Sequence, residues 1–459
     1  MKLESNKLQG EVIEYSQKEM LVRGVAGSGK TICLIKNAII KAEKEPENRI
    51  YFFTYNKTLK KYIEIMFKKQ GFDNIYVNNF HSWAFSEVRN LYPGFRVLSS
   101  KERSCLLQES IKAASQFHKG RFIKEENENF LLEEFSYISS QYIRSRKEYL
   151  TYNRIGRGNS VRLSKKDREE IYSIFEFFES LKYSRKKFEF SDFAKLLLNG
   201  IHNLKVKKME RVYIDEGQDL DKAQLLLLRK LAQESFYIAA DMGQKIYKTS
   251  YTWKDVGVNV LGGRTKVLTQ SFRTTKEILE LAECFQMKDS IVDDNEFQKS
   301  DMTKMRRGYK PKVVYYEGVN SKDKLVSFLK ESYTTGVNHV VGLLVREKKH
   351  VNTLACYLRS NGISIEEIRD DLGNTTTSGI KITTRHSSKG LEFDHVIIVD
   401  FQEEHHLSNN NVDEDTLNAE RRLNYVSFSR ARQLLTIFAS KDKPSILFEE
   451  LDPSLYEEV

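Results

Sequence analysis

The sequence has few cysteines and no long apolar run, and both absences restrict its class. The four cysteines stand far apart and form no CxxC pair. Their spacing argues against a disulfide framework and against a zinc site. No apolar run approaches the roughly 18 residues that a membrane span needs, and the N-terminus lacks the apolar core of a signal peptide. We therefore expect a cytoplasmic protein with no membrane partner.

The charge balance of the chain is basic. Its 459 residues include 74 Lys and Arg against 64 Asp and Glu, which gives a formal charge of +10. This excess fits a polyanionic partner, although many basic proteins bind none. The chain is also too long for a single core, so we expect about two to four compact units.

A glycine-rich stretch, MLVRGVAGSGKT at residues 20–31, is the most specific pattern in the chain. A short apolar strand precedes the glycines, and apolar residues at helical spacing follow them. Glycines let backbone N–H groups surround a phosphate at the positive end of a helix. Lys30 would reach the β and γ phosphates of a nucleotide, and the Thr31 hydroxyl would bind the magnesium ion between them. The residues that we assign to this site are Gly24, Ala26, Gly27, Ser28, Gly29, Lys30, Thr31 and Ile32.

Two adjacent carboxylates follow a second apolar strand, in RVYIDEGQDL at residues 211–220. In a parallel sheet, Asp215 and Glu216 would lie at the strand end beside the phosphate loop. Asp215 would then hold the magnesium shell, and Glu216 would take a proton from the attacking water. An isolated DE pair is usually a surface feature, but the strand before this one favours a catalytic role.

Two further segments near the N-terminus have open interpretations. Gln9 reads either as a residue that contacts the edge of an adenine or as a solvated helix residue. His81, Ser82 and Trp83 follow a short strand at residues 74–77 and are placed to meet a nucleic-acid backbone and base. A capped helix start with a buried Trp is the alternative for these three residues.

Long helical patterns without a strand signal extend from about Leu91 to Phe188. Their most basic segment, residues 141–168, has only Glu148 and Asp167 as acidic residues and contains interleaved tyrosines. Basic groups neutralise phosphates and aromatic rings stack on bases, which favours a single-strand binding surface. A solvated helix face is the alternative.

DEGQD resembles the second nucleotide motif of superfamily 1A DNA helicases, the UvrD, Rep and PcrA group. Further segments resemble the later motifs in the family's order: FYIAADMGQKIY (236–247), VLTQSFRTTKEI (267–278), IKITTRHSSKGLEFDHVIIVD (380–400) and ERRLNYVSFSRAR (420–432). The resemblance implies that Gln244 senses the γ-phosphate, and that Arg273 and Arg430 bind it. It also implies that Phe272 stacks on the adenine of ATP, which Gln9 reads, that Glu392 lies at the ribose, and that Gly390 belongs to the nucleotide-binding residues.

The same resemblance implies a set of contacts with nucleic acid. Trp253 is displaced from its usual distance to the glutamine of DMGQ, and tyrosine is more common than Phe272 at the adenine. The residues that the resemblance places at nucleic acid are Asn56, Lys57, His81, Ser82, Trp83, Tyr247, Trp253, Thr384 and His386.

The fold implied by the resemblance is α/β, with two RecA-like P-loop NTPase motor domains and a helical insertion in the first. We expect the first motor domain at residues 1–90 and 189–263, the insertion at 91–188 and the second motor domain at 264–459. Full-length family members carry a further domain, called 2B, within the second motor domain. Here only Ser364 to Thr377 is available at that place, which is too short for a domain.

The function implied by the resemblance is ATP-dependent movement on single-stranded or tailed DNA, in the 3′-to-5′ direction. The missing 2B domain motivates an alternative, in which the chain is a nucleotide-gated DNA-sensing or regulatory subunit of a larger antiviral or nuclease-containing complex. A related motor that acts on RNA is a third hypothesis, because contacts to phosphates and stacked bases discriminate poorly.

Overall fold

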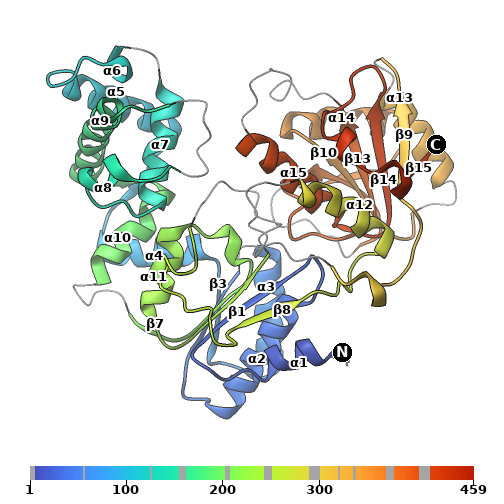
Figure 1. The fold of residues 1–459 in the computed structure, drawn as a ribbon, viewed down its shortest axis with the longest axis horizontal. Helices are drawn as coiled ribbons and strands as arrows, with labels where there is room; N and C mark the ends of the chain where they lie inside the picture. Colours follow the sequence, from blue (N-terminus) through green and yellow to red (C-terminus); the bar gives the residue numbers. More distant parts are fainter. Residues whose placement is uncertain are drawn as a thin grey trace.

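The computed structural model describes residues 6–54, 57–124, 127–154, 162–201, 207–241, 251–288, 300–318, 321–333, 337–368, 377–402 and 414–459. These residues form two α/β domains, each built on a parallel sheet, and a helical insertion that extends from the first domain (Figure 1). The expected α/β fold class is therefore confirmed.

The first domain is built on a parallel sheet with strand order β3-β2-β6-β7-β1-β8. Its strands are β1 (Glu19–Gly24), β2 (Ile50–Phe53), β3 (Ile75–Asn78), β6 (Met209–Ile214), β7 (Ala232–Ala240) and β8 (Thr265–Leu268). Its helices are α1 (Lys7–Ile13), α2 (Lys30–Lys44), α3 (Lys57–Lys69), α4 (Phe80–Leu91), α10 (Phe193–Ile201) and α11 (Lys222–Leu231), with short 3-10 turns η1 (Phe190–Asp192) and η2 (Gly217–Asp219).

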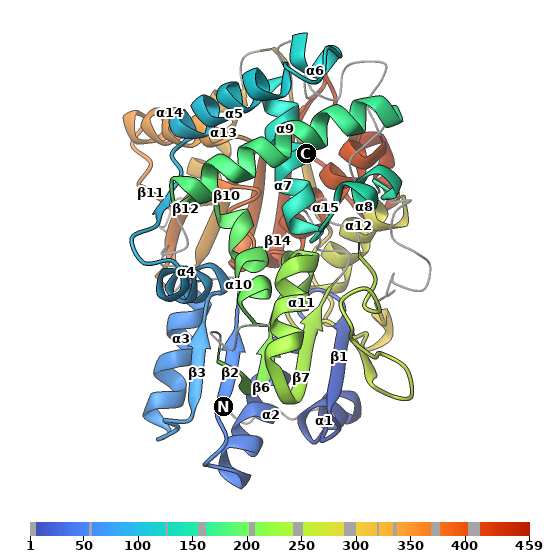
Figure 2. The same ribbon diagram turned by 90° about the vertical axis from the view of Figure 1, so that its left-hand side faces the viewer.

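Alternate side chains of these strands supply two separate cores. Met20 and Val22 of β1 pack with α2 and α3 on one face, whereas Leu21 packs with α4, α10 and α11 on the other. Successive residues of a strand point to opposite faces, so a strand buried on both sides is apolar throughout. Figure 2 looks onto the face that α4, α10 and α11 cover.

The helical insertion begins and ends in a two-stranded parallel ribbon. This ribbon, β4 (Arg96–Val97) with β5 (Lys187–Phe188), was not expected, because strands of two residues leave no recognisable sequence pattern. The helices between its strands are α5 (Ser100–Ala114), α6 (Arg121–Lys124), α7 (Glu128–Ser140), α8 (Arg146–Thr151) and α9 (Lys165–Ser184).

The second domain has a parallel sheet with strand order β11-β12-β10-β13-β14-β9-β15. Its strands are β9 (Lys312–Tyr316), β10 (Val340–Val345), β11 (Ile365–Glu367), β12 (Gly379–Thr384), β13 (Phe393–Phe401), β14 (Ala431–Ser440) and β15 (Glu457–Glu458). Its helices are α12 (Lys276–Met287), α13 (Ser321–Ser332), α14 (Lys348–Ser360) and α15 (Glu414–Phe428), with the turns η4 (Met302–Lys304), η6 (Phe448–Glu450) and η7 (Pro453–Leu455).

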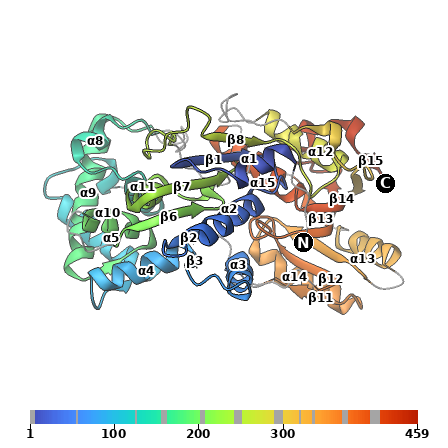
Figure 3. The same cartoon turned by 90° about the horizontal axis from the view of Figure 1, so that it is seen from below.

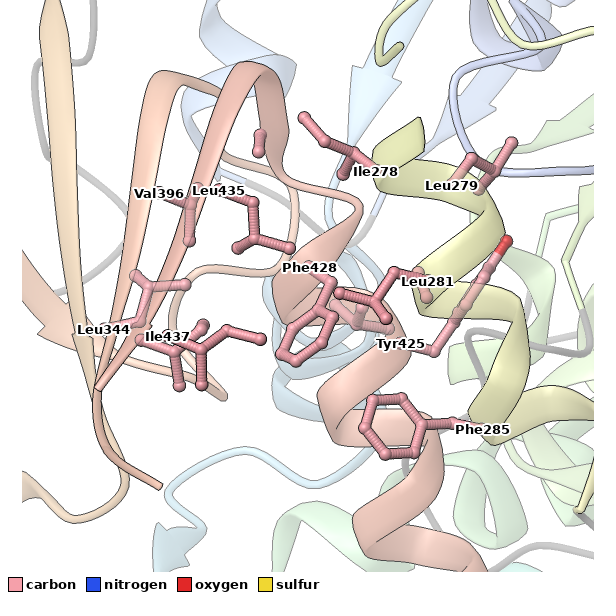
Figure 4. Packing of buried hydrophobic residues seen from close by; sticks show 14 of the residues in the cluster. Ile278, Leu279, Leu281, Phe285, Leu344, Val396, Tyr425, Phe428, Leu435 and Ile437 are labelled. Atoms are coloured by element: carbon pink, nitrogen blue, oxygen red, sulfur yellow. The ribbon is translucent and has the colours of Figure 1, made fainter. Parts of the chain in front are cut away.

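Helix α15 and helix α12 cover one face of the second sheet. Phe428 and Tyr425 of α15 pack against Phe285 of α12 and against Ile437 of β14 in one buried cluster (Figure 4). The other face packs against α13 and α14. Seen from below, the two domains lie side by side (Figure 3).

The boundary between the domains differs from the expected one. Strand β8 pairs in parallel with β1, so the first sheet continues to Leu268 rather than ending at residue 263. In the second domain, β11 ends at Glu367 and β12 begins at Gly379, and the two strands are neighbours in the sheet. The chain between them is too short for a domain, which supports the predicted lack of a 2B insertion. Among the helices of the described ranges, none is long and apolar enough to cross a membrane.

Candidate nucleotide site and nucleic-acid surface

The glycine-rich turn lies between β1 and α2, as its sequence predicts. Gly27 and Gly29 have φ angles of 74° and 85°, which are left-handed values that glycine adopts without strain. The Lys30 ammonium group donates hydrogen bonds to the carbonyl oxygens of Gly24 (2.7 Å) and Val25 (3.0 Å). The lysine therefore lies over the turn, at the positive end of the α2 dipole.

Two buried hydroxyl groups at this turn lack hydrogen-bond partners among the residues that the structure describes. They are the Oγ atoms of Ser28, in the turn, and Ser271, which would lie 2.8 Å from a Cβ built on Gly27. A buried polar group without a partner costs free energy. A phosphate-bearing ligand would supply the acceptors, so the site fits a nucleotide.

Thr31 and Asp215 are in direct contact. The Thr31 hydroxyl lies 2.9 Å from both carboxylate oxygens of Asp215, at the end of β6. Burial, and then the charge of Glu216, raise the pKa of Asp215 to about 7. Hydroxyl and carboxylate oxygens are ligands that Mg²⁺ accepts, and a cation would offset the cost of burying an ionised Asp215. These residues therefore fit the expected magnesium site.

Glu216 occupies an unusual backbone conformation and faces several cations. Its φ angle is 55°, a left-handed value that is rare for residues other than glycine and often marks a functional site. Burial by itself would raise the pKa of its carboxyl group, but Lys389, Lys30 and Arg430 outweigh burial and lower the pKa. Gln218 also donates a hydrogen bond to this carboxylate. Glu216 is therefore ionised at neutral pH, as a general base requires.

Two arginines from the later half of the chain lie near the glycine-rich turn and Glu216. Arg273 donates a hydrogen bond to Glu392 (2.6 Å), which also pairs with Arg432 (2.8 Å). Arg430 is buried; its burial and the charge of Arg273 lower its pKa to about 10, whereas Glu216 and Glu392 act in the opposite direction. The charges of one carboxylate from each domain, Glu216 and Glu392, thus act on the Arg430 guanidinium group.

Two apolar side chains beside the turn are exposed. Phe272 is 50% exposed, and its backbone N–H donates to the carbonyl oxygen of Gly27 (2.9 Å). Ile32, in the first turn of α2, is 43% exposed. Gly390 is also exposed and has a φ angle of 81°. Exposed apolar surface beside a phosphate loop is suited to a nucleobase.

Gln9 lies against the glycine-rich turn. Its side chain donates to the carbonyl oxygen of Ser28 (3.1 Å), and a Cβ added to Gly29 would lie 2.9 Å from its Nε2 atom. Asn6 and Gln9 form a reciprocal capping box at the start of α1, which holds the glutamine in place. The structure thus brings Gln9 to the loop, whereas its contact with adenine stays a prediction.

The HSW segment starts helix α4. Asn79 caps the helix by accepting hydrogen bonds from the backbone N–H groups of His81 and Ser82, and Trp83 packs edge-to-face against Phe53 at 5.5 Å. The structure thus shows the capped helix start of the alternative interpretation, but Trp83 is half-buried rather than buried, and a contact of this segment with nucleic acid stays a prediction. Ser82 remains exposed, and burial lowers the pKa of His81.

Phe190 is an exposed aromatic residue that sequence reasoning missed. Its ring is 49% exposed and lies 5.8 Å from the ring of His81 in an edge-to-face contact. It belongs to η1, in the segment EFSDF, where only helical periodicity was recognised. The sequence did contain a signal for this exposed ring, because Phe190 stands between the polar residues Glu189 and Ser191 at a helix start. Its ring is suited to stacking on an exposed base.

Several residues expected at nucleic acid are placed differently or lie outside the described residues. Trp253 is only 8% exposed and packs in the first core beside Tyr251, so the expected base contact of Trp253 is not supported. Thr384 is buried and pairs with the Ser387 hydroxyl, whereas His386 is exposed. Asn56, Gln244 and Tyr247 lie outside the described residues, and Lys57 is described only as the first residue of α3.

Two cations of the basic segment make contacts inside the insertion. Arg154 pairs with the buried Glu134, and Arg168 donates to the carbonyl oxygens of Tyr149 and Tyr152. Tyr149 itself is fully buried, so it cannot stack on a base in this arrangement. Arg144, Lys147, Arg162, Lys165 and Lys166 are exposed, and residues 155–161 lie outside the described residues. A single-strand surface on this segment therefore stays a prediction, with Arg154 and Arg168 instead pairing polar groups inside the insertion.

Family models match both parts of the chain. The model of the UvrD/REP helicase N-terminal domain matches residues 5–252, and the model of the UvrD-like helicase C-terminal domain matches residues 364–442. The first match covers more than half of the chain. The chain belongs to the UvrD/Rep helicase family.

Curated members of the UvrD/Rep family match over most of this chain. The ATP-dependent DNA helicase PcrA of Bacillus subtilis is 22% identical over 429 residues, which are 84% of this chain and 52% of that protein. PcrA of Staphylococcus epidermidis is 23% identical over 438 residues, 84% of this chain and 52% of that protein. A DNA helicase II homologue of Mycoplasma capricolum is 22% identical over 392 residues, 79% of this chain and 49% of that protein. The chain spans about half the length of these relatives.

Two contacts between the domains of this UvrD/Rep-type chain were not found from the sequence. The backbone N–H of Ala26 donates to the hydroxyl oxygen of Tyr425 (3.4 Å), and Lys389 forms an ion pair with Asp219. The residues of both contacts lie in motifs that the sequence analysis recognised. The spacing of motifs along the chain does not show which side chains of the two domains meet. The Lys389 charge also acts on Glu216, so the ion pair lies close to the carboxylates.

Proposed function

We propose that this chain is an ATP-dependent motor that moves along single-stranded or tailed DNA in the 3′-to-5′ direction. The observation that carries the proposal is that charged groups from both domains act on Glu216, close to the phosphate loop. Lys30 and Glu216 come from the first domain, and Arg430 from the second acts on Glu216. Cations on both sides of a nucleotide would neutralise the charge that develops during phosphoryl transfer.

Each residue around the phosphate loop has a proposed role. Glu216 accepts a proton from the attacking water, and Lys30, Arg273 and Arg430 bind the phosphates. Thr31 and Asp215 would hold a magnesium ion, which neutralises charge on the β and γ phosphate oxygens. The exposed ring of Phe272 stacks on the adenine, with Gln9 at its edge and Glu392 near the ribose.

The domain arrangement supports conversion of hydrolysis into movement. We propose a first motor domain at residues 1–90 and 189–268, a helical insertion at 91–188 and a second motor domain at 269–459. Nucleotide binding would draw the two motor domains together through the arginines, and hydrolysis would release them. His386 on one domain and the His81 and Phe190 pair on the other would then grip a strand alternately.

ATP turnover by the wild type and by Lys30→Ala, each with and without single-stranded DNA, tests the proposal. We expect DNA to stimulate the wild type, and Lys30→Ala to lower both rates by about 100-fold or more. Lys44→Ala is a matched control, because Lys44 is exposed at the far end of the same helix. A turnover rate that is unaffected by DNA would refute the motor.

The short connection between β11 and β12 favours a second candidate function. Without a 2B domain, the chain would act as a nucleotide-gated DNA-binding subunit, and a protein partner such as a nuclease would supply the missing function. Unwinding of tailed duplexes, with tails of both polarities, separates the candidates. Unwinding by the isolated chain would count against the second candidate, and the preferred tail would report the direction.

A further inference from the structure

Two arginines follow the paired ends of neighbouring strands in the second domain. Val345 ends β10 and Thr384 ends β12, and these two residues are partners in the parallel register. Arg346 and Arg385 come next on each strand. The backbone N–H of Arg385 donates to the carbonyl oxygen of Val345 (2.8 Å), which keeps the two strand ends together.

Both arginines bind the same face of helix α15. Arg346 forms an ion pair with Glu420, and Arg385 donates to the side-chain oxygen of Asn424 (3.1 Å). Glu420 and Asn424 are four residues apart, so they lie one above the other on a helix. The ends of β10 and β12 are therefore attached to α15 at two successive turns.

The guanidinium group of Arg385 is held in a closed environment. Arg385 is fully buried; it also donates to the carbonyl oxygens of Val399 (3.5 Å) and Asp400 (3.4 Å) and lies over the ring of Phe401 at 5.3 Å. Burying a cation is costly unless its geometry is well satisfied. Arg385 therefore favours one arrangement of the β12 end and helix α15. A shift of either element would leave its buried charge without these partners.

Helix α15 leads from these arginines to the phosphate loop and to Glu216. Tyr425 directly follows Asn424, and its hydroxyl oxygen accepts a hydrogen bond from Ala26 in the phosphate loop. Arg430 lies just beyond the end of α15 at Phe428 and acts on Glu216. On the other side, Arg385 stands between Thr384 and His386, the residues expected at the DNA strand.

We propose that Arg385, together with Arg346, is a positioning residue that couples DNA at the Thr384–His386 turn to Arg430 at the nucleotide. The inference rests on the proposed motor function and adds the route by which DNA stimulates hydrolysis. A packed helix with fixed attachments moves as a unit, so a displacement at the strand ends reaches its far end. No base or phosphate contact is assigned to Arg385 itself.

The test compares Arg385→Met with the wild type in ATP turnover, with and without saturating single-stranded DNA. We expect the stimulation by DNA to fall by roughly 3- to 30-fold, the range of coupling effects seen for residues between two sites. The basal rate and the KM for ATP should stay within about twofold, because Arg385 does not contact nucleotide. A purely structural role would lower basal and stimulated rates together.

The matched control is Lys381→Met. Lys381 is also a buried cation of β12, but it pairs with Glu366 of the edge strand β11. Its loss should leave the stimulation unchanged, provided that the variant folds as judged by thermal unfolding.

Asn424→Ala tests the same contact from the helix side and does not depend on the folding of Arg385→Met. The stimulation of its ATP turnover by DNA should fall as in Arg385→Met. The variant that combines both changes should lose no more stimulation than the more affected single variant. If DNA stimulates the wild type and Asn424→Ala equally, the inference is overturned. If DNA does not stimulate the wild type, the proposed motor function fails instead.

Discussion

Gly27 in the phosphate loop packs directly against Arg273, in the segment that leads to the second domain. A Cβ built on Gly27 would lie 2.5 Å from the Cβ of Arg273, which is closer than real Cβ atoms come to a neighbour. The backbone N–H of Phe272 donates to the carbonyl oxygen of Gly27 (2.9 Å), so the contact is made between backbones. The backbone of Arg273, for which a phosphate-binding role is proposed, is thereby held beside the loop.

Gly27→Ala should therefore impair ATP turnover more than it impairs folding. The added methyl group would push Arg273 away from the loop, so we expect the kcat to fall by about 10-fold or more. Gly71→Ala is the control, because Gly71 also has a positive φ (81°) but has no neighbour within 4 Å of an added Cβ. Each variant should lose about 1 kcal/mol of stability from backbone strain, but Gly71→Ala should keep its turnover. Equal turnover in the two variants would contradict the importance of this contact.

Arg430→Gln should lower the kcat for ATP by about 1,000-fold and change the KM little. An arginine that stabilises the charge of the transition state contributes mainly to kcat, as arginine fingers do. Arg359→Gln serves as the control, since Arg359 lies on the surface of α14, where it pairs with Glu367 and donates to the carbonyl oxygen of Ile365. Steady-state ATP turnover at varied ATP concentration measures both constants. A raised KM with an unchanged kcat would show that Arg430 binds substrate without assisting the reaction.

Phe190→Ala should weaken the binding of single-stranded DNA. Stacking of one base on an aromatic ring contributes about 1 to 3 kcal/mol, so the Kd should rise by roughly 5- to 150-fold. Phe117→Ala is matched to it, because Phe117 is also an exposed phenylalanine (70%) but lies in the insertion. Fluorescence anisotropy with a labelled oligonucleotide measures both variants. Equal affinity of the two alanine variants for single-stranded DNA would rule out base stacking on Phe190.

Asp221→Asn should change the pH dependence of stability. Asp221 caps α11 by accepting from the backbone N–H of Gln224 (2.8 Å), and burial raises the pKa of its carboxyl group from 3.8 to about 7. The folded protein then binds more protons than the unfolded chain between these two pH values. The stability that Asp221 contributes is fully present below about pH 4 and is lost as the pH rises through about 7.

Asparagine caps a helix as well as aspartate but does not titrate in this range. The wild type should therefore lose stability relative to Asp221→Asn between about pH 4 and 7. The difference should be on the order of 1 kcal/mol, because Asp221 keeps part of its surface exposed. Thermal unfolding of both proteins across this pH range tests whether the wild type loses stability relative to Asp221→Asn as the pH rises. Parallel Tm curves would show that the carboxyl group titrates near its ordinary value.

Local sequence patterns predicted the strand, turn and helix around Lys30, because glycines and apolar spacing act within a few residues. They also predicted that Asp215 and Glu216 end a buried strand, which β6 confirms. The family resemblance placed Trp253 at nucleic acid, but Trp253 is buried in the first core. Tyr149, one of the tyrosines interleaved in the basic segment, fills the core of the insertion. An aromatic residue reads the same in a sequence whether it faces solvent or packs inside, because burial depends on distant neighbours.

By itself, the sequence determined the phosphate loop, since apolar periodicity and glycine geometry are properties of the local chain, and its resemblance to a known family implied the two α/β domains. Only the tertiary structure decided that β8 completes the first sheet, that Arg273 packs on Gly27 and that Arg385 holds α15. These relationships join residues far apart in the chain. They follow from the packing of buried surfaces and from the need of buried charges for partners, and neither can be read from one segment alone.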